Sequence, residues 1–181
     1  MLKISIPDSE FFDNESQTFL YLKGQDISLE HSLVSIAKWE SKWNVPFLSD
    51  KTQKTKEMFL DYIRCMTITQ NVNPYLYYKI SNKDIEKIQE YINAPMTATW
   101  FNDDKARPRP SREVVTAEIV YYWMIALGIP MECQKWHFNR LITLVRVCSI
   151  KNTPDKKMSR KDWIAKRNAA NAAYRRGIRK H

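Results

Sequence analysis

Glycine is scarce in this chain of 181 residues, which holds three: Gly24, Gly128 and Gly177. None of them lies in a phosphate-cradling loop or in a dinucleotide fingerprint, so the sequence predicts no nucleotide-dependent chemistry. Long hydrophobic runs are missing as well. No window approaches the roughly 18 uninterrupted apolar residues of a membrane span, and the N-terminus lacks the apolar run of a signal peptide. We therefore expect a soluble protein with no membrane partner.

Cysteine is also sparse, and its three residues, Cys65, Cys133 and Cys148, are far apart in the sequence. An odd number of cysteines in apolar or helical contexts favours free thiols in a reducing compartment over the disulfide framework of a secreted protein. A chain of this length can bury a sufficient core without disulfides. We expect a cytoplasmic protein.

The net charge of +9 is confined to the end of the chain. Residues 1–150 hold 18 Lys and Arg against 18 Asp and Glu, whereas residues 151–181 hold 11 against 2. Any steering toward an anionic partner therefore comes from this basic tail alone. Such a run binds phosphate backbones with salt-sensitive affinity, or it is a solvated appendage that folds against a protein partner; both interpretations stay open. The candidate basic contacts are the ten Lys and Arg side chains of residues 155–181: Lys156, Lys157, Arg160, Lys161, Lys166, Arg167, Arg175, Arg176, Arg179 and Lys180.

The hydrophobic pattern predicts an α+β fold that is mostly α-helical. Apolar and polar residues alternate within residues 2–30, which predicts a small N-terminal antiparallel β element, and helical spacing begins at Leu29. We expect residues 1–150 to form a single globular domain, with the β element in 1–30 and a bundle of about five helices in 31–150. Residues 151–181 are expected to form a basic, partly flexible helical tail. The expected helices of the body span residues 29–43, 54–69, 82–93, 112–128 and 130–150.

Residues 118–152 combine aromatic side chains with a cysteine and a histidine, and could form a metal site, a membrane element or a core. Gly128 and Pro130 are typical of a helix end followed by a helix start, so we expect two antiparallel helices joined by a tight connection. Cys133 and His137 lie four residues apart, a spacing that would bring two zinc ligands onto one helical face. A structural zinc site needs four ligands, however, and the other cysteines and histidines show no paired spacing.

A nucleophilic pair formed by Cys133 and His137 would also lack a recognisable elbow or oxyanion motif. We interpret Cys133 as a small buried hydrophobic residue and His137 as a packed ring. No constellation of residues indicates catalysis. We expect no enzyme activity, no metal and no cofactor.

Tryptophan is abundant, with six residues in the chain. The helical spacing of Trp39, Trp123 and Trp136 is that of core or partly buried positions. Trp43 and the adjacent pair Trp100 and Phe101, which lies in the proline-rich loop expected at residues 93–111, are candidates for a surface that holds another chain.

Long phrases of the sequence also carry a family resemblance. They are "LEHSLVSIAKWESKW" with "PFL" (29–48), "DYIRCMTITQNVNP" (61–74), "PMTATWF" (95–101), "EIVYYWMIALGIPMECQKWHFNRLITLVRVCSIKN" (118–152) and the ending "MSR…RNAANAAYRR". Taken together they resemble the tail assembly chaperones of siphophages, a family of tailed bacteriophages and prophages of Gram-positive hosts. The resemblance covers nearly the whole chain.

This resemblance implies a non-enzymatic late protein that binds the tape measure protein, a long and largely helical polypeptide, and helps to recruit tail tube subunits. It implies a place in the cytoplasm of the infected bacterial host and absence from the mature virion. Docking of tape measure helices on aromatic patches is the expected mode of binding, with Trp43, Trp100, Phe101 and Trp136 as candidate contacts. Self-association stays open. The alternatives are a nucleic-acid-binding phage protein that acts through the basic tail, or a structural tail or connector component of the virion.

Overall fold

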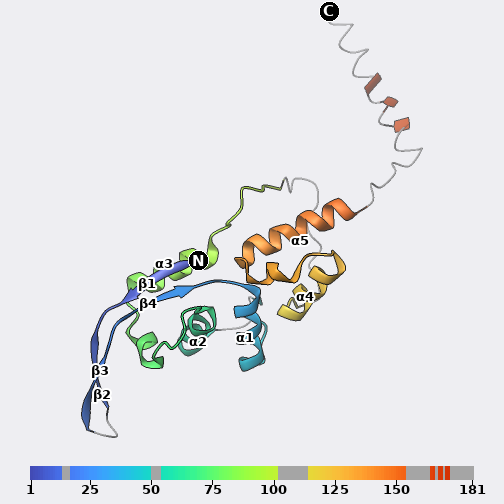
Figure 1. Cartoon of the computed structure of the whole chain (residues 1–181). Helices are drawn as coiled ribbons and strands as arrows, with labels where there is room; N and C mark the ends of the chain where they lie inside the picture. The colour runs from blue at the N-terminus through green and yellow to red at the C-terminus, as the bar shows by residue number, and fades with distance from the viewer. Residues whose placement is uncertain are drawn as a thin grey trace, which may run out of the picture. The chain divides into compact units, whose positions relative to one another are not determined.

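A computed structural model describes residues 1–13, 17–49, 54–101 and 114–153, together with residues 164–165, 167–168 and 170–171 of the tail. The chain divides into two compact units, Met1–Ser149 and Ile150–His181. The fold is α+β and mostly helical, as predicted (Figure 1). The elements of the described residues are β1 (Leu2–Ile6), β2 (Ser9–Asp13), β3 (Thr18–Leu22), β4 (Gln25–Leu29), α1 (Leu33–Trp43), α2 (Lys56–Met66), η1 (Pro74–Lys79), α3 (Asn82–Asn93), α4 (Ala117–Ala126), η2 (Met131–Lys135) and α5 (Phe138–Asn152).

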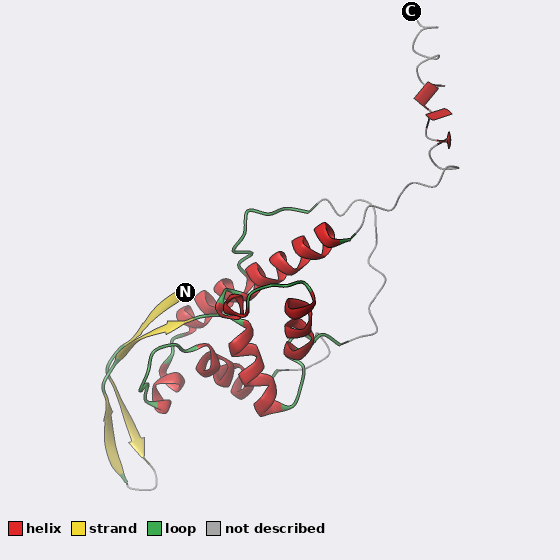
Figure 2. Ribbon diagram, turned by 45° about the vertical axis from the view of Figure 1, so that its right-hand side comes forward, coloured by secondary structure: helices red, strands yellow, loops and turns green. Residues whose placement is uncertain are grey.

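The N-terminal strands form a bent, two-stranded antiparallel ribbon. Its inner half pairs β1 with β4, with Ile4 opposite Ile27, and its outer half pairs β2 with β3, with Phe12 opposite Phe19. Alternation along β1 and β4 places isoleucine and leucine side chains in the core and polar ones outside, as a half-buried strand requires. The outer half, which we call the arm (residues 9–13 and 17–22), extends past the helices (Figure 2).

The bend of the ribbon is fixed by Asp8 and Gly24. The Gly24 N–H donates to Asp8 Oδ1 at 2.6 Å, and the Tyr21 hydroxyl donates to the other carboxylate oxygen. A Cβ at position 24 would lie 2.4 Å from the Ile6 carbonyl oxygen and 2.6 Å from the Asp8 nitrogen. Glycine is therefore required here because the two strands approach too closely for a side chain.

Helix α1 is the centre of the body, and it packs against α2 and α4. Leu33, Ile36 and Trp39 are fully buried, and the Trp39 indole N–H donates to the Met58 carbonyl oxygen at 2.8 Å. The helix begins at a capping box between Ser32 and Ser35, a device that satisfies the free N–H groups of the first turn.

Buried Glu40 ties α1 to two other segments. Its Oε1 accepts from the Phe47 N–H and its Oε2 from the Ala117 N–H, each at 2.7 Å. Ala117 is the first residue of α4, whose preceding Thr116 makes no side-chain cap. The carboxylate therefore supplies, from another helix, the negative charge that a helix N-terminus favours.

Three of the predicted helix boundaries are wrong, and tertiary pairing explains the first two. The first helix starts at Leu33 rather than 29, because residues up to Leu29 continue β4. The second ends at Met66 rather than 69, since Thr67 forms a β-bridge with Leu29. The fourth starts at Ala117 rather than 112: residues 114–116 are not helical, and residues 112–113 lie outside the described ranges. The third helix follows Ser81 as predicted, and Gly128 follows α4 with a φ of 65°.

The predicted helix 130–150 is interrupted, which corrects the expected tight helical connection. Pro130 precedes the short 3₁₀-helix η2, and α5 begins only at Phe138. His137 lies in an extended link that forms a β-bridge with Ser32, and the Phe138 N–H donates to the His31 carbonyl oxygen at 2.7 Å. Cys133 and His137 therefore do not share a helical face, because pairing with residues 31–32 replaces the helical turn between them.

Candidate partner-binding site

The four aromatic residues predicted to contact a partner lie on three segments. Trp43 is in the last turn of α1, Trp136 is in the link before α5, and Trp100 and Phe101 follow α3 in a segment without helix or strand. Each has its own set of neighbours. The side chains therefore have to be considered one by one.

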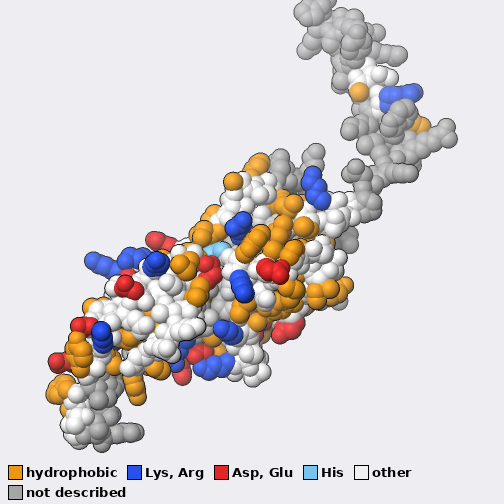
Figure 3. Space-filling view, in the orientation of Figure 1, with side chains coloured by type: hydrophobic (Ala, Val, Ile, Leu, Met, Phe, Trp, Pro, Cys, Tyr) orange, Lys and Arg blue, Asp and Glu red, His pale blue; other side chains and the backbone are white. Residues whose placement is uncertain are grey.

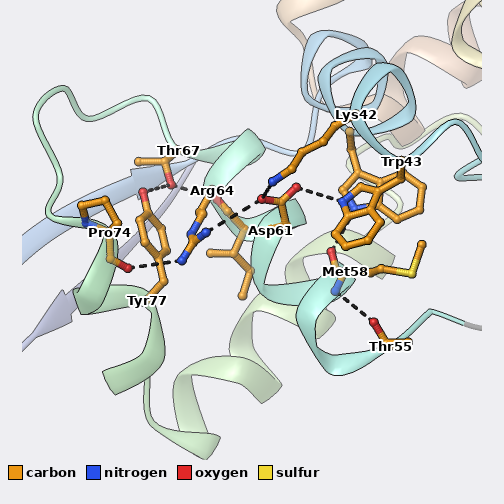
Figure 4. A network of polar contacts seen from close by, with 11 residues as sticks. Lys42, Trp43, Thr55, Met58, Asp61, Arg64, Thr67, Pro74 and Tyr77 are labelled. Atoms are coloured by element: carbon orange, nitrogen blue, oxygen red, sulfur yellow. Dashed lines mark hydrogen bonds and ion pairs between the residues drawn. The ribbon is translucent and has the colours of Figure 1, made fainter. Parts of the chain in front are cut away.

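Trp43 is half-buried and already engaged with the buried carboxylate of Asp61 (Figure 4). Its indole N–H donates to Asp61 Oδ2 at 2.9 Å, while the Lys42 ammonium binds Oδ1 and Arg64 Nη1 lies 4.0 Å from the same oxygen. A buried charge needs such partners because desolvation would otherwise destabilise it. Trp43 also lines a pocket of about 420 Å³ with Tyr78.

Trp136 and Phe101 are both partly covered by arginines of α5. The Arg140 guanidinium carbon lies 4.2 Å from the Trp136 ring centroid, and that of Arg146 lies 4.0 Å from the Phe101 centroid. These are cation–π distances. Trp100, by contrast, is 82% exposed, so it is the most accessible of the four predicted contacts.

The solvent-facing side of α4 was not among the contacts predicted from the sequence. Ala117, Val120 and Met124 are buried on one side of this helix, whereas Tyr122 is 67% and Ile125 is 70% exposed on another. We call Tyr122 and Ile125 the α4 face. Figure 3 shows hydrophobic side chains gathered over α4 and α5. The sequence does contain a signal for a covered surface, because "IVYYWMIAL" (119–127) has no charged residue. A helix that is apolar all round is normally covered on every side.

The arm is a second exposed aromatic surface. Phe19 is 70% and Tyr21 is 64% exposed, and the rings of Phe12 and Phe19 meet edge to face with centroids 5.0 Å apart. Alternation along a strand places Phe19 and Tyr21 on the same side of the ribbon, and Phe12 stands opposite Phe19 in the register. These three side chains form the aromatic side of the arm.

Two histidines are buried together beneath α2 and α3. The ring centroids of His31 and His137 are 5.1 Å apart, and His31 Nδ1 bonds to the Tyr62 hydroxyl. The Asn139 N–H donates to His137 Nδ1 at 3.3 Å, so His137 Nε2 donates to the Tyr91 carbonyl oxygen at 2.9 Å. Burial lowers the pKa of His31 to about 3 and also lowers the pKa of His137. Both rings are therefore neutral at pH 7.

Both ring nitrogens of His137 are thus hydrogen-bonded, and Cys133 is buried in η2. Within the described ranges, no three or more His, Cys, Asp or Glu side chains are grouped so that they could hold a metal ion. None of the helices in those ranges combines the length and the apolar character needed to cross a membrane.

Of the ten basic tail residues, Arg167 alone belongs to the described part of the chain, where it is helical and exposed. The other nine lie outside the described residues. Residues 102–111 of the predicted loop also lie outside them.

Comparisons of the whole chain with protein-family models, with curated protein sequences and with solved structures return no match.

Proposed function

We propose that this protein is a non-enzymatic tail assembly chaperone that binds the tape measure protein of a siphophage and aids assembly of the tail tube. Two things support the proposal: the long phrases that resemble this family, and the α4 face. The α4 face carries most weight. It leaves Tyr122 and Ile125 exposed on a helix that carries no charged residue after Glu118 of its first turn.

In this proposal an amphipathic helix of the tape measure protein packs along α4. Packed helix axes lie about 8–10 Å apart, so the apolar stripe of the partner would cover Tyr122 and Ile125 directly. Burial of a large apolar side chain contributes about 1.5–3 kcal/mol, so two such residues matter for affinity. Trp100 is the second candidate contact because most of its side chain is exposed.

The basic tail would make a further contact, with the tape measure protein, with the tail tube protein or with nucleic acid. A nucleic-acid-binding phage protein is the second candidate function, favoured by the confinement of the net positive charge to residues 151–181. In either case the protein acts in the cytoplasm of the infected host. As a chaperone it leaves before the virion is complete, whereas a tail or connector component would remain.

The test is capture of partners by the tagged protein from late-infected cells, with nuclease treatment and identification of the bound proteins by mass spectrometry. The wild type should recover a very long, largely helical phage protein, and purified virions should lack the bait. The variant Tyr122→Lys with Ile125→Lys should reduce recovery of that protein about 10-fold or more, because charge on the α4 face prevents burial of both side chains.

The matched control is Gln70→Lys with Asn82→Lys, which adds the same two charges at exposed polar positions away from α4. It should bind like the wild type. Equal recovery by the α4 variant and this control would contradict the proposed docking on α4. The same measurement on Trp100→Ala with Phe101→Ala tests the proposed contact through Trp100 and Phe101. Recovery of nucleic acid alone, lost with nuclease, would favour the second candidate function; the bait in purified virions would favour a structural role.

A further inference from the structure

The arm is unusual because it is both aromatic and acidic. The rings of Phe12, Phe19 and Tyr21, three described residues of the arm, are exposed. The arm contains Glu10 and Asp13, and the whole sequence from Asp8 to Leu22 contains four Asp or Glu and no Lys or Arg. A two-stranded ribbon is marginally stable in water by itself. These features point to a surface that is covered by another chain.

A pocket of about 550 Å³ lies on the same unit and has the complementary character. It is formed by the link after α1, by α2 and α3, and by the start of α5, and its floor is aromatic. It is lined by His31, Phe47, Leu48, Ser49, Lys54, Met58, Phe59, Tyr62, Gln89, Ile92, Asn93, Phe138 and Asn139. We call it the α2–α3 pocket.

The charges around the α2–α3 pocket are the opposite of those on the arm. The described residues that line it include no carboxylate, and Lys54 is the one permanently charged side chain among them, with the ammonium 4.0 Å from the Phe47 ring centroid. His31 adds no charge at neutral pH because burial lowers its pKa to about 3. The amides of Gln89 and Asn93, at exposed positions of α3, can pair with backbone groups of a strand edge.

We propose that the arm of one copy of this protein docks into the α2–α3 pocket of a second copy. The rings of Phe12 and Phe19 enter the aromatic pocket, as anchors do at protein interfaces, and the carboxylates beside them face Lys54. Pockets of about 300–1,000 Å³ commonly hold groups of this size. The inference goes beyond the proposed function and does not depend on it.

Charge also decides between this contact and direct pairing of two arms. Two arms side by side would bring their carboxylates together, and repulsion between like charges disfavours that association. Docking of the arm in the α2–α3 pocket joins two different surfaces, so a pair of copies keeps one free arm and one free pocket. The contact therefore predicts oligomers that grow with concentration, rather than a closed dimer.

The test is the oligomeric state of the full chain, measured by sedimentation velocity up to about 100 µM. The arm variant is Phe12→Ser with Phe19→Ser, and the pocket variant is Gln89→Glu with Asn93→Glu, which places repelling charge at the rim. A control, Gln70→Glu with Asn82→Glu, adds the same charge elsewhere. We expect concentration-dependent oligomers for the wild type and the control, at least about 10-fold weaker association for either variant, and weaker association at high salt.

A 1:1 mixture of the two variants is the decisive sample. The arm variant keeps its pocket and the pocket variant keeps its arm, so the mixture should form a dimer that grows no further. A wild type that stays monomeric, or a mixture that stays monomeric although the wild type associates, would overturn the proposal. Unchanged association of both variants would do the same.

A second measurement does not rely on the arm variant folding. Thr18→Cys in one copy and Asn93→Cys in another keep both proposed anchor rings and should give a disulfide-linked heterodimer when the two are mixed with a thiol oxidant such as diamide. Homodimers through position 18 alone would show arm-to-arm pairing and would overturn the proposal, as would the absence of any cross-link between positions 18 and 93.

Discussion

Polar side chains in the interior organise this protein at the scale of single residues. Glu40 joins α1 to the N-terminus of α4, and Asp61 pairs with Lys42 and accepts a hydrogen bond from Trp43. His31 bonds to Tyr62, and its ring meets that of His137 edge to face. Buried polar groups stabilise a fold only when their hydrogen bonds are made, so each of these residues fixes the relative placement of the elements it joins.

Burial of His31 predicts that acid destabilises the fold. The pKa of this imidazole is about 3 in the folded protein against 6.5 for the exposed group. Protonation therefore favours the unfolded chain, so the stabilisation is complete above pH 6.5 and is lost as pH falls from 6.5 toward 3. Replacement His31→Phe should flatten the decrease in the free energy of unfolding between pH 7 and pH 5, as measured by urea denaturation.

The matched control for this measurement is Tyr62→Phe, which removes the same hydrogen bond but keeps the imidazole. Both variants should be less stable than the wild type at pH 7, since each loses one buried hydrogen bond. The Tyr62→Phe variant should keep the wild-type dependence on pH. If His31→Phe keeps it too, His31 is not the group that titrates.

At the scale of elements, the ribbon depends on a bend that one glycine permits. Inner and outer halves share the same two chain segments, yet β1 and β4 are packed on the core, whereas the arm buries Leu22 and exposes the rings of Phe12, Phe19 and Tyr21. The change of direction at Asp8 and Gly24 separates these two roles. The structure of the link before α5 is likewise set by pairing with residues 31–32 and not by helical preference.

Replacement of Gly24 by alanine should destabilise the protein more than replacement of Gly128. At Gly24 the new methyl group would overlap the Ile6 carbonyl oxygen, whereas no atom lies within 4 Å of the corresponding position at Gly128. Gly128→Ala would cost about 1–2 kcal/mol from its left-handed backbone alone. Thermal unfolding of both variants measures the difference; a smaller decrease in Tm for Gly24→Ala would show that the ribbon is not held as closely as described.

At the scale of the whole molecule, charge and apolar surface lie in different parts of the chain. The body of residues 1–150 carries equal numbers of acidic and basic side chains, and the excess belongs to residues 151–181. The exposed aromatic groups of the arm and of α4 belong to the unit Met1–Ser149. Short-range apolar recognition and long-range electrostatic attraction can therefore be separated by experiment.

Deletion of residues 155–181 should weaken binding of the proposed partner most strongly at low salt. Electrostatic attraction extends over about 30 Å at 0.01 M ionic strength but only about 8 Å at 0.15 M, so the contribution of the tail shrinks as salt is added. Affinity measured for the full and the shortened chain across that range tests this expectation. An equal loss at every salt concentration would contradict an electrostatic role for the tail.

The sequence by itself determined the fold class, the position of the ribbon before the helices and the start of α3 after Ser81, because alternation, helical periodicity and capping are local properties of the chain. The enrichment in aromatic residues is likewise a property of the sequence itself. Tertiary structure decided what these residues do: Trp43 is held by Asp61, whereas Tyr122 and Ile125 remain exposed.

The tertiary structure alone also decided where α4 begins, why the helix before Phe138 is interrupted and which histidines meet. Glu40 and Ala117 are far apart in sequence, as are Ser32 and His137, and no local pattern records their contact. Once such groups are buried together, their hydrogen bonds outweigh the helical preference of a few residues, since that preference is a fraction of a kcal/mol per residue, about 0.7 at most for ordinary side chains.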